Sequence, residues 1–515
     1  MTSRLSDSWR SEAVSGGAPR IWPRRLPDPS RMDLVRRGAV IAGVTARHLA
    51  PFVLRQAFHE RALRVPAPVL ARQLRLIFED LGGTFIKFGQ IIASSPAMFG
   101  EAVANEFRSC LDTGPAVDFP SVRARVEDDL GMPLDEAFAE FDPDPIGRAS
   151  IAVVHRARLH DGTEVAVKVL RPGIERDSSR DLCLMMPVIG LVVRQTGDQM
   201  AGSILQLVDG FREQLGEEMD LRNEARALAH FRRLGEEVSL PSVVVPEPYP
   251  ELSGLNVLTM EYLDGVPIDD LRAVEALGVD PAPLVEAVVR AFFLTTVRWG
   301  AFHGDVHAGN MLVLRDGRIG VIDWGIVGRL DPDTHRFFVR LLAGALGDES
   351  AWADVTAHIT STYGPAIADA VGLDNEQLTL FVRSLIEPTL NRPFGEVSLA
   401  AVMQTTQLQV ARAQGIEAHR RTPGALAHRL RAQRRLRRMA DDAGGTLSDF
   451  DRATFLLGKQ LMYFERYGKM FLSDVPILHD RAFFTQLLAD AGELGTPDAH
   501  RYAEPVDGSQ REVER

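Results

Sequence analysis

The segment from Phe302 to Gly325 constrains the fold and the chemistry of this chain more than any other. It reads FHGDVHAGNMLVLRDGRIGVIDWG. Two apolar runs flank Asp316-Gly317, a pair typical of a two-residue type I′ hairpin turn, because both turn positions need positive φ. With that turn, the strand ladder places Asn310 directly opposite Asp323, about 4.5–5.5 Å away. The sequence therefore predicts that an amide oxygen and a carboxylate oxygen meet at the open end of one hairpin.

Oxygen ligands of this kind suit Mg²⁺, which usually takes one or two protein groups together with phosphate oxygens and water. Asp305 precedes Asn310 in Asp-Val-His-Ala-Gly-Asn, and Asp323 begins Asp-Trp-Gly. An aspartate, four residues, an asparagine and a later Asp-x-Gly is the spacing of a kinase-type phosphotransfer site. We interpret Asp305 as the catalytic aspartate and Asn310 and Asp323 as metal ligands.

Two other interpretations of this segment are weaker. A zinc site could use His303 and His307, but Gly304 and Gly309 disfavour a helix that would present both rings on one face. A polar surface loop is the remaining alternative, and it does not explain why a turn, a ladder and three suitably spaced ligands occur together.

Composition limits the class of protein. The chain has 515 residues, 45% hydrophobic and 25% charged, which is ordinary for a globular protein and too long for a single core. A net charge of −12 disfavours nucleic acid as a partner. Cys110 and Cys183 lack metal or redox spacing, which favours a reducing compartment. With no secretory signal and no apolar run of 18 residues, we expect a cytoplasmic chain without a transmembrane helix.

The pattern of elements predicts an α+β, bilobal, protein-kinase-like fold: a small mixed lobe with an antiparallel sheet and a larger helical lobe, preceded by a helical extension. The predicted segments are a disordered arm (1–30), the helical extension (31–115), the small lobe (116–262), the large lobe (263–400), carboxyl-terminal helices (401–494) and a loose tail (495–515).

Lysine is rare here, with four among 58 Lys and Arg residues. In so Arg-rich a chain, a lysine indicates a position that needs a compact point charge. For Lys459 and Lys469, residual codon usage explains the lysine as well. Lys168 lies in VAVK on the return strand of an Asp-Gly hairpin, pointing away from the face shared by its valine neighbours. A strand lysine in this context contacts the α- and β-phosphates of a nucleotide.

The partner of Lys168 should be a glutamate on the following helix, predicted over 203–234. Glu224 is our choice and Glu217 the competitor. Glu218 and Glu224, six residues apart on one helix, would face about 120° apart, so Glu218 needs a separate cation. Lys87, in GGTFIKFGQ, is the candidate.

Together KFGQ, VAVK, EMDLRNEA, HGDVHAGN and DWG resemble the UbiB/AarF family of atypical protein-kinase-like proteins, called ADCK in animals, from about residue 75 to about 330. The resemblance implies binding of ATP and Mg²⁺, with Asp305, Lys168 and Glu224 as catalytic residues. It also implies that Lys87 and Gln90 belong to an extension lying across the active cleft. The partner of this extension would be a Glu-x-Asp motif, which Glu218 and Asp220 fill in this chain.

The family has an alanine-rich phosphate loop, whereas this chain reads GRASIAVVH at 147–155. This departure bears on nucleotide preference and turnover, and not on the fold. Many members carry carboxyl-terminal transmembrane helices, and none is evident here. The expected nucleotide contacts are Gly147, Arg148, Ala149, Ser150, Ile151, Val154, Lys168, Glu261 and Leu263.

By this resemblance we expect an atypical kinase or ATPase that supports isoprenoid quinone biosynthesis or lipid-linked metabolism. The alternatives are a small-molecule phosphotransferase of the aminoglycoside or choline kinase type, which shares HGD…N, and a nucleotide-binding scaffold. Expected partners are a nucleotide, the inner membrane surface and quinone-biosynthesis proteins; the sequence leaves the oligomeric state open. A basic helix near 422–440 either lies on anionic lipid or is a solvated or carboxylate-paired face.

Overall fold

The computed structural model describes residues 21–58, 67–93, 99, 101–107, 110, 116–196, 210–238, 240–363, 375–398 and 452–493. The chain divides into two compact units. Unit 1 contains residues 1–239, 244–265 and 320–326, and unit 2 contains 240–243, 266–319 and 327–515. The division after residue 265 is close to the lobe boundary predicted at 262/263. The basic helix near 422–440 and the tail lie outside the described residues.

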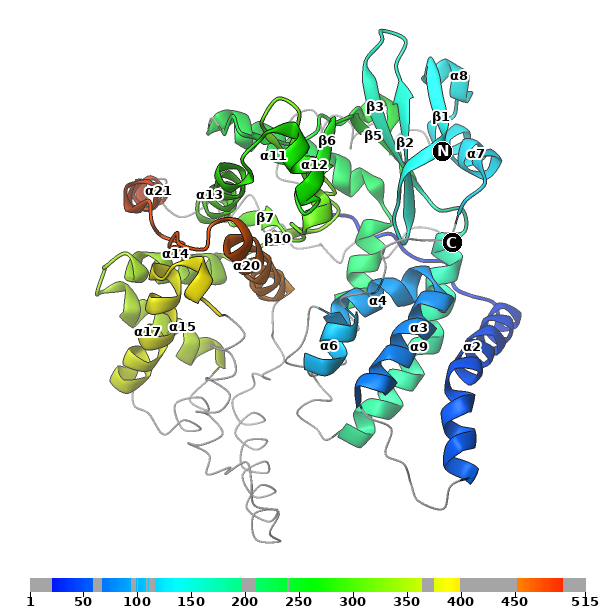
Figure 1. The fold of residues 1–515 in the computed structure, drawn as a ribbon, viewed down its shortest axis with the longest axis horizontal. Helices are drawn as coiled ribbons and strands as arrows, with labels where there is room; N and C mark the ends of the chain where they lie inside the picture. Colours follow the sequence, from blue (N-terminus) through cyan, green and yellow to red (C-terminus); the bar gives the residue numbers. More distant parts are fainter. Residues whose placement is uncertain are drawn as a thin grey trace, which may run out of the picture. The chain divides into compact units, whose positions relative to one another are not determined.

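Unit 1 is built on an antiparallel sheet of order β1-β2-β3-β5 (Figure 1). Its strands are β1 (Glu140–Arg148), β2 (Ala152–Arg158), β3 (Glu164–Leu170) and β5 (Val257–Glu261). Val165, Val167 and Val169 are fully buried in one apolar cluster with side chains of α7 (Phe119–Leu130) and α8 (Leu134–Ala137). The predicted alternation along VAVKV is confirmed, because the valines fill the core and Lys168 takes part in polar contacts.

Five helices pack together in unit 1 (Figure 1). They are α2 (Arg31–Phe58), α3 (Ala67–Leu81), α4 (Gly83–Ala93), α6 (Glu101–Phe107) and α9 (Ile174–Thr196). A Cβ added to Gly89 in α4 would lie 3.0 Å from Phe107 Cδ1 and 3.3 Å from Cys110 Sγ. Glycine therefore lets α4, which carries KFGQ, approach α6 closely.

The prediction of one long helix over 203–234 is wrong. Residues 210–218 are helical, the helix ends at Met219, and α11 (Leu221–Glu237) begins after Asp220. Asp220 has extended backbone angles, and its carboxylate accepts a hydrogen bond from Arg222 N, which makes it the N-cap of α11. Glu218 and Glu224 thus belong to different helices, and the angle expected between them on a single helix does not apply.

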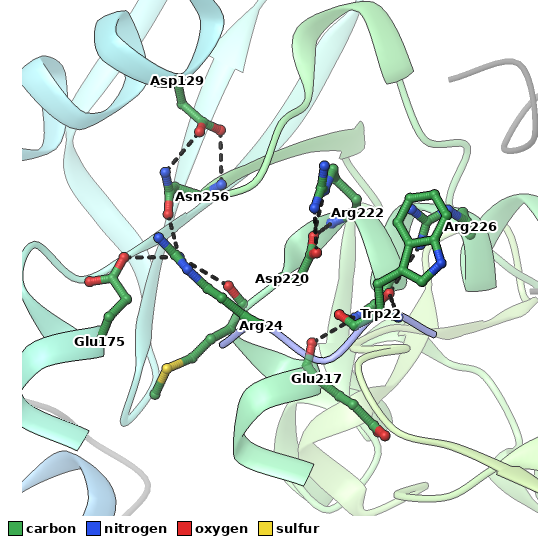
Figure 2. A network of polar contacts seen from close by, with 11 residues as sticks. Trp22, Arg24, Asp129, Glu175, Glu217, Asp220, Arg222, Arg226 and Asn256 are labelled. Carbon is green, nitrogen blue, oxygen red and sulfur yellow. Dashed lines mark hydrogen bonds and ion pairs between the residues drawn. The ribbon is translucent and has the colours of Figure 1, made fainter. Parts of the chain in front are cut away.

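Residues 21–30, predicted to be disordered, follow a defined course against unit 1 (Figure 2). Trp22 N donates to Asn223 Oδ1 at 2.9 Å, and Asn223 Nδ2 donates to Trp22 O at 3.1 Å. The Arg226 guanidinium stacks 3.8 Å from the centre of the Trp22 ring. These contacts hold the segment at the first turn of α11, so the prediction fails for 21–30. Residues 1–20 lie outside the described part.

Arg24 carries most of the charge contacts of this segment (Figure 2). Its Nη1 lies 2.9 Å from Glu175 Oε1 and donates to Asn256 Oδ1 at 2.7 Å and to Met219 O at 3.2 Å. Met219 is the last residue before the N-cap of α11. Arg24 therefore stabilises the carbonyl that the helix break leaves without a helical partner.

Unit 2 is mostly helical. Its helices are α12 (Leu271–Leu277), α13 (Pro281–Trp299), α14 (Pro332–Ala345), α15 (Ala351–Tyr363), α17 (Asn375–Asn391), α20 (Arg452–Phe471) and α21 (Arg481–Glu493). Strand β7 (Ala301–His303) pairs antiparallel with β10 (Val327–Arg329). A sheet of order β4-β9-β8-β6 comprises β4 (Val243–Val244), β6 (Gly265–Pro267), β8 (Met311–Leu314) and β9 (Ile319–Val321). No helix in the described ranges is both long and apolar enough to cross a membrane.

The β8–β9 turn differs from the predicted two-residue type I′ turn. Leu314 N donates to Arg318 O at 2.9 Å, and Gly317, with φ 84°, donates to Leu314 O. Three residues therefore form the loop, with glycine alone in the left-handed region. Asp316 Oδ1 accepts from Arg318 N and stabilises this longer turn.

The added turn residue shifts the strand register by one, so the predicted opposition of Asn310 and Asp323 in the ladder is wrong. Asn310 ends the short helix η2 (Ala308–Asn310) in unit 2, and Asp323 follows β9 in unit 1.

Candidate functional site

Lys168 on β3 is paired with two carboxylates of unit 1. Its Nζ lies 2.8 Å and 3.0 Å from the carboxylate oxygens of Glu224 on α11 and 2.9 Å from Asp323 Oδ1. The predicted contact between Lys168 and Glu224 is confirmed, and Glu217 is not the partner. Burial alone would lower the pKa of Lys168, but the charges of Asp323 and Glu224 outweigh it and raise that pKa.

Glu224 is 2% exposed. Burial raises the pKa of Glu224 to about 7, although the charge of Lys168 acts to lower it. Asp323 and Glu218 add to the rise, because like charges disfavour another carboxylate. The negative charge around Lys168 therefore exceeds the single positive charge that this lysine supplies.

Asp323 has φ 58° and is the only non-glycine residue with positive φ in the described part of the chain. Aspartate tolerates this region better than most residues, and such outliers cluster at functional sites. Trp324 holds the turn: its ring lies 4.3 Å from that of Phe231, and its Nε1 donates to Val321 O. The Asp323 side chain remains 43% exposed, so it fits a hard cation that also binds phosphate.

A second ion pair lies beside the first. Lys87 Nζ on α4 is 2.8 Å from Glu218 Oε2, which confirms the predicted pairing. A Cβ added to Gly325 would lie 3.4 Å from Asp323 Oδ1, 3.8 Å from Glu224 Oε2 and 3.9 Å from Glu218 Cγ. Both ion pairs and the Asp-Trp-Gly turn therefore meet around Gly325.

We call Lys87, Lys168, Glu218, Glu224 and Asp323 the Gly325 cluster. Asp220 does not pair as the family motif implies. Its carboxylate accepts from the Arg222 guanidinium and caps α11 (Figure 2). Gln90 lies half-buried on α4.

The predicted phosphate loop forms the turn between β1 and β2. Ala149 N donates to Ala152 O, and the Arg171 guanidinium donates to Ala149 O. Ser150 and Ile151 are 1% and 5% exposed, so a nucleotide contact at these two positions would involve the backbone of the turn, and the contact stays a prediction.

The other residues predicted to contact the nucleotide differ in exposure and in hydrogen-bond partners. Arg148 at the end of β1 is exposed, and Gly147 pairs with Val154 across the strands. Glu261 accepts from Arg232 Nη1, and Leu263 lies half-buried just after β5. Arg148 is thus the exposed cation of this set, and the Glu261 side chain is 37% exposed.

In unit 2, residues 303–310 form what we call the Asp305 loop. Asp305 N donates to His303 Nδ1 at 3.0 Å, and Asn310 Nδ2 donates to Asp305 O at 2.9 Å. Asn310 is 5% exposed. The two predicted site residues of this loop are thus joined directly. The described residues contain no group of three His, Cys, Asp or Glu that could hold a metal, and the zinc interpretation gains no support.

Two residues of α20 reach the Asp305 loop, and the sequence did not predict either contact. Lys459 Nζ lies 2.7 Å from Asp305 Oδ1, and Val306 N donates to Gln460 Oε1 at 3.1 Å. The rarity of lysine was the available signal for Lys459, but no spacing in the sequence links it to Asp305.

Comparison with known proteins places the chain in a family. The model of the ABC1 atypical kinase-like domain matches residues 109–354. An aarF domain-containing protein kinase of Arabidopsis thaliana, described as uncharacterized and chloroplastic, is 33% identical over 411 residues, which is 79% of this chain and 73% of that protein. The chain belongs to the UbiB/AarF family. The predicted α+β protein-kinase-like fold is confirmed with it.

Other relatives are covered less fully. An uncharacterized protein of Mycobacterium tuberculosis is 39% identical over 53% of this chain and 56% of its own length. A probable protein kinase UbiB of Marinobacter nauticus is 36% identical over 65% of this chain and 60% of its own. A solved Mycobacterium tuberculosis protein in complex with erythromycin aligns at TM-score 0.41 and 21% identity, covering 80% of this chain and 97% of that one, and adds nothing to the assignment.

Proposed function

We propose that this chain is an atypical kinase or ATPase that acts on ATP with Mg²⁺. The observation that carries the proposal is the contact of Lys168 with both Glu224 and Asp323. A lysine held by a helix glutamate, beside the aspartate of an Asp-x-Gly turn, is the arrangement that phosphoryl-transfer enzymes of the kinase type use.

Each residue has a role in this proposal. Lys168 binds the α- and β-phosphates as a point charge, and Glu224 holds it in place. Asp323 would supply an oxygen ligand to Mg²⁺, which would neutralise charge on the phosphates when bound, and the metal role expected for Asn310 stays a prediction. Asp305 orients the attacking hydroxyl or water. The exposed Arg148 would contact phosphate from the β1–β2 turn.

We further propose that the acceptor is a small lipid-like molecule or water, in support of isoprenoid quinone biosynthesis. Support comes from relatives named UbiB and from the Lys87–Glu218 pair, which anchors α4 beside Gly325. On this proposal, a helix anchored there excludes a folded protein acceptor from the site.

Nucleotide binding is tested by thermal shift with ATP, with and without Mg²⁺. Asp323→Asn should remove the Mg²⁺-dependent part of the shift, while Asp135→Asn, at a largely exposed position, should behave as wild type. An unchanged Mg²⁺-dependent shift in Asp323→Asn would contradict the metal role.

Turnover is tested by phosphate release, with and without phenolic quinone-precursor mimics and anionic liposomes. Asp305→Asn should lower turnover by about 10²–10⁴-fold and spare ATP affinity, because the carboxylate acts on the acceptor. Turnover that survives while affinity falls would make Asp305 a ligand-binding residue instead.

A further inference from the structure

One face of α20 contacts the Asp305 loop at successive residues. Lys459 pairs with Asp305, and Gln460 accepts a hydrogen bond from Val306 N. One turn later, the Tyr463 ring lies 6.4 Å from the ring of His307 and below the Lys459 ammonium, 5.7 Å from its Nζ. Residues three and four apart share a helix face, so one face of α20 lies against Asp305, Val306 and His307.

These contacts are largely buried. Gln460 is 0% exposed, and the side chains of Lys459 and Asp305 are 13% and 18% exposed. An ion pair so shielded from water orients its groups far more strongly than a solvated surface pair does. The arrangement therefore restricts the Asp305 carboxylate to a narrow set of orientations.

The Asp305 loop has no permanent cation in its own sequence, since HGDVHAGN contains neither Lys nor Arg. α20 brings one from far along the chain. Lysine is also the rarer choice here, four against 54 arginines among 58 basic residues. A compact ammonium can engage one carboxylate oxygen, whereas a planar guanidinium tends to engage both.

We propose that α20 completes the catalytic loop, with Lys459 as the positioning residue of Asp305 and Gln460 as the anchor of the loop backbone. Lys459 holds Oδ1 of Asp305 and thereby directs the carboxylate toward the acceptor hydroxyl or water. This inference rests on the proposed function. It adds a residue outside the matched kinase-like domain to the machinery for phosphoryl transfer.

The test compares steady-state ATP turnover of the full chain in four forms: wild type, Lys459→Met, Lys459→Arg and Lys469→Met. Lys469 lies on the same helix, pairs with Glu465 and is more exposed, so its variant is the matched control. Lys459→Met should lower kcat by about 10²-fold, as misplacement of a catalytic group does. The KM for Mg-ATP should stay within about twofold of wild type, because Lys459 acts on the acceptor side.

Lys459→Arg should recover part of kcat, because it restores the charge but not the geometry, and Lys469→Met should match wild type. Equal kcat in wild type and Lys459→Met would overturn the proposal. A Lys459→Met variant whose KM for Mg-ATP rises while kcat stays at the wild-type value would also overturn the proposal. If wild type itself neither hydrolyses ATP nor is stabilised by it, the proposed function fails, and the role of Lys459 fails with it.

A double-mutant cycle gives a readout that does not depend on activity. The unfolding equilibrium constants of Lys459→Met, Asp305→Asn and the double variant should depart from multiplicativity by about twofold or more. Strict multiplicativity would overturn the pairing. Gln460→Ala keeps the charge of Lys459 and tests Gln460 as the anchor of the loop backbone. In this variant kcat should fall while KM is retained. An unchanged kcat would overturn that part of the proposal.

Discussion

The Gly325 cluster and the Asp305 loop place charged residues by different means. In the cluster, two lysines from β3 and α4 face three carboxylates from two further helices and the Asp-Trp-Gly turn. The opposite charges position one another. In the Asp305 loop, one carboxylate faces one lysine, and backbone hydrogen bonds to His303 and Gln460 fix the segment. Substitutions in the cluster should therefore affect stability most, and substitutions around Asp305 should affect turnover most.

Lys168→Met should have the largest effect on stability, because it leaves Glu224 buried without its cation. Breaking a buried pair in this way costs about 3–5 kcal/mol in the free energy of unfolding. Adding Glu224→Gln should recover much of the loss. Urea denaturation measures both variants beside Lys459→Met, which should lose less. A Lys168→Met variant as stable as Lys459→Met would remove the contrast between the two regions.

Arg24→Ala tests how strongly Arg24 holds the segment before α2 against unit 1. The variant removes charge-assisted hydrogen bonds to Asn256 and Met219 O, each worth about 1.5–3 kcal/mol when a charged group takes part. Unfolding free energy should fall by an amount in this range, as urea denaturation would show. The matched control is Arg25→Ala at the exposed neighbouring position, which should be neutral. Equal effects of the two variants would show that residues 21–30 are not held by Arg24.

Lys87 and Glu218 should show coupling in a double-mutant cycle with alanine at both positions. Their side chains are 16% and 8% exposed, so we expect about 0.5–1.5 kcal/mol, in the lower half of the range for residues in contact. Nucleotide affinity should also change in Lys87→Ala, because Glu218 lies next to Gly325. Additive effects, with wild-type affinity for nucleotide in Lys87→Ala, would place this pair outside the cluster.

Acid should lower the stability of both units by less than the substitutions above, through buried His155 in unit 1 and buried His335 in unit 2. Burial lowers the pKa of His155 in unit 1 and of His335 in unit 2 below the ordinary value of 6.5. A depressed histidine pKa favours the neutral folded form, so its contribution is full above pH 6.5 and is lost as pH falls through the folded pKa.

The measurement is the free energy of unfolding between pH 7 and pH 5. His155→Gln and His335→Gln should each flatten its decline, whereas His160→Gln, at an exposed turn, should not. A decline as steep in both buried-position variants as in wild type would assign the acid sensitivity to other groups.

The sequence predicted the contacts that follow from short, regular elements. Alternation along β3 separates Lys168 from the valines, and the acidic run 217–224, which extends into the first turn of α11, contains the partners of both Lys87 and Lys168. The two errors in local geometry, the three-residue turn and the break at Asp220, arise from aspartate side chains that bond nearby backbone N–H groups. Such competition is decided by local hydrogen bonds that periodicity does not register.

The contacts of Trp22, Arg24, Lys459 and Gln460 were not predicted for a different reason. Each joins residues far apart in sequence, and neither composition nor spacing encodes such a contact. Residues 21–30 are rich in proline and arginine, which is typical of loose segments, yet Arg24 and Trp22 find partners at a helix terminus. Tertiary contacts of this kind override local composition.

Residues 320–326 belong to unit 1, although the chain on both sides of them belongs to unit 2. No single cut in the gene therefore separates the units. A fragment ending at residue 265 would encode Lys168 and Glu224 without Asp323, and the complementary fragment would carry Asp323 away from its lysine. Chimaeras with relatives that exchange unit 1 must therefore exchange 1–239, 244–265 and 320–326 together.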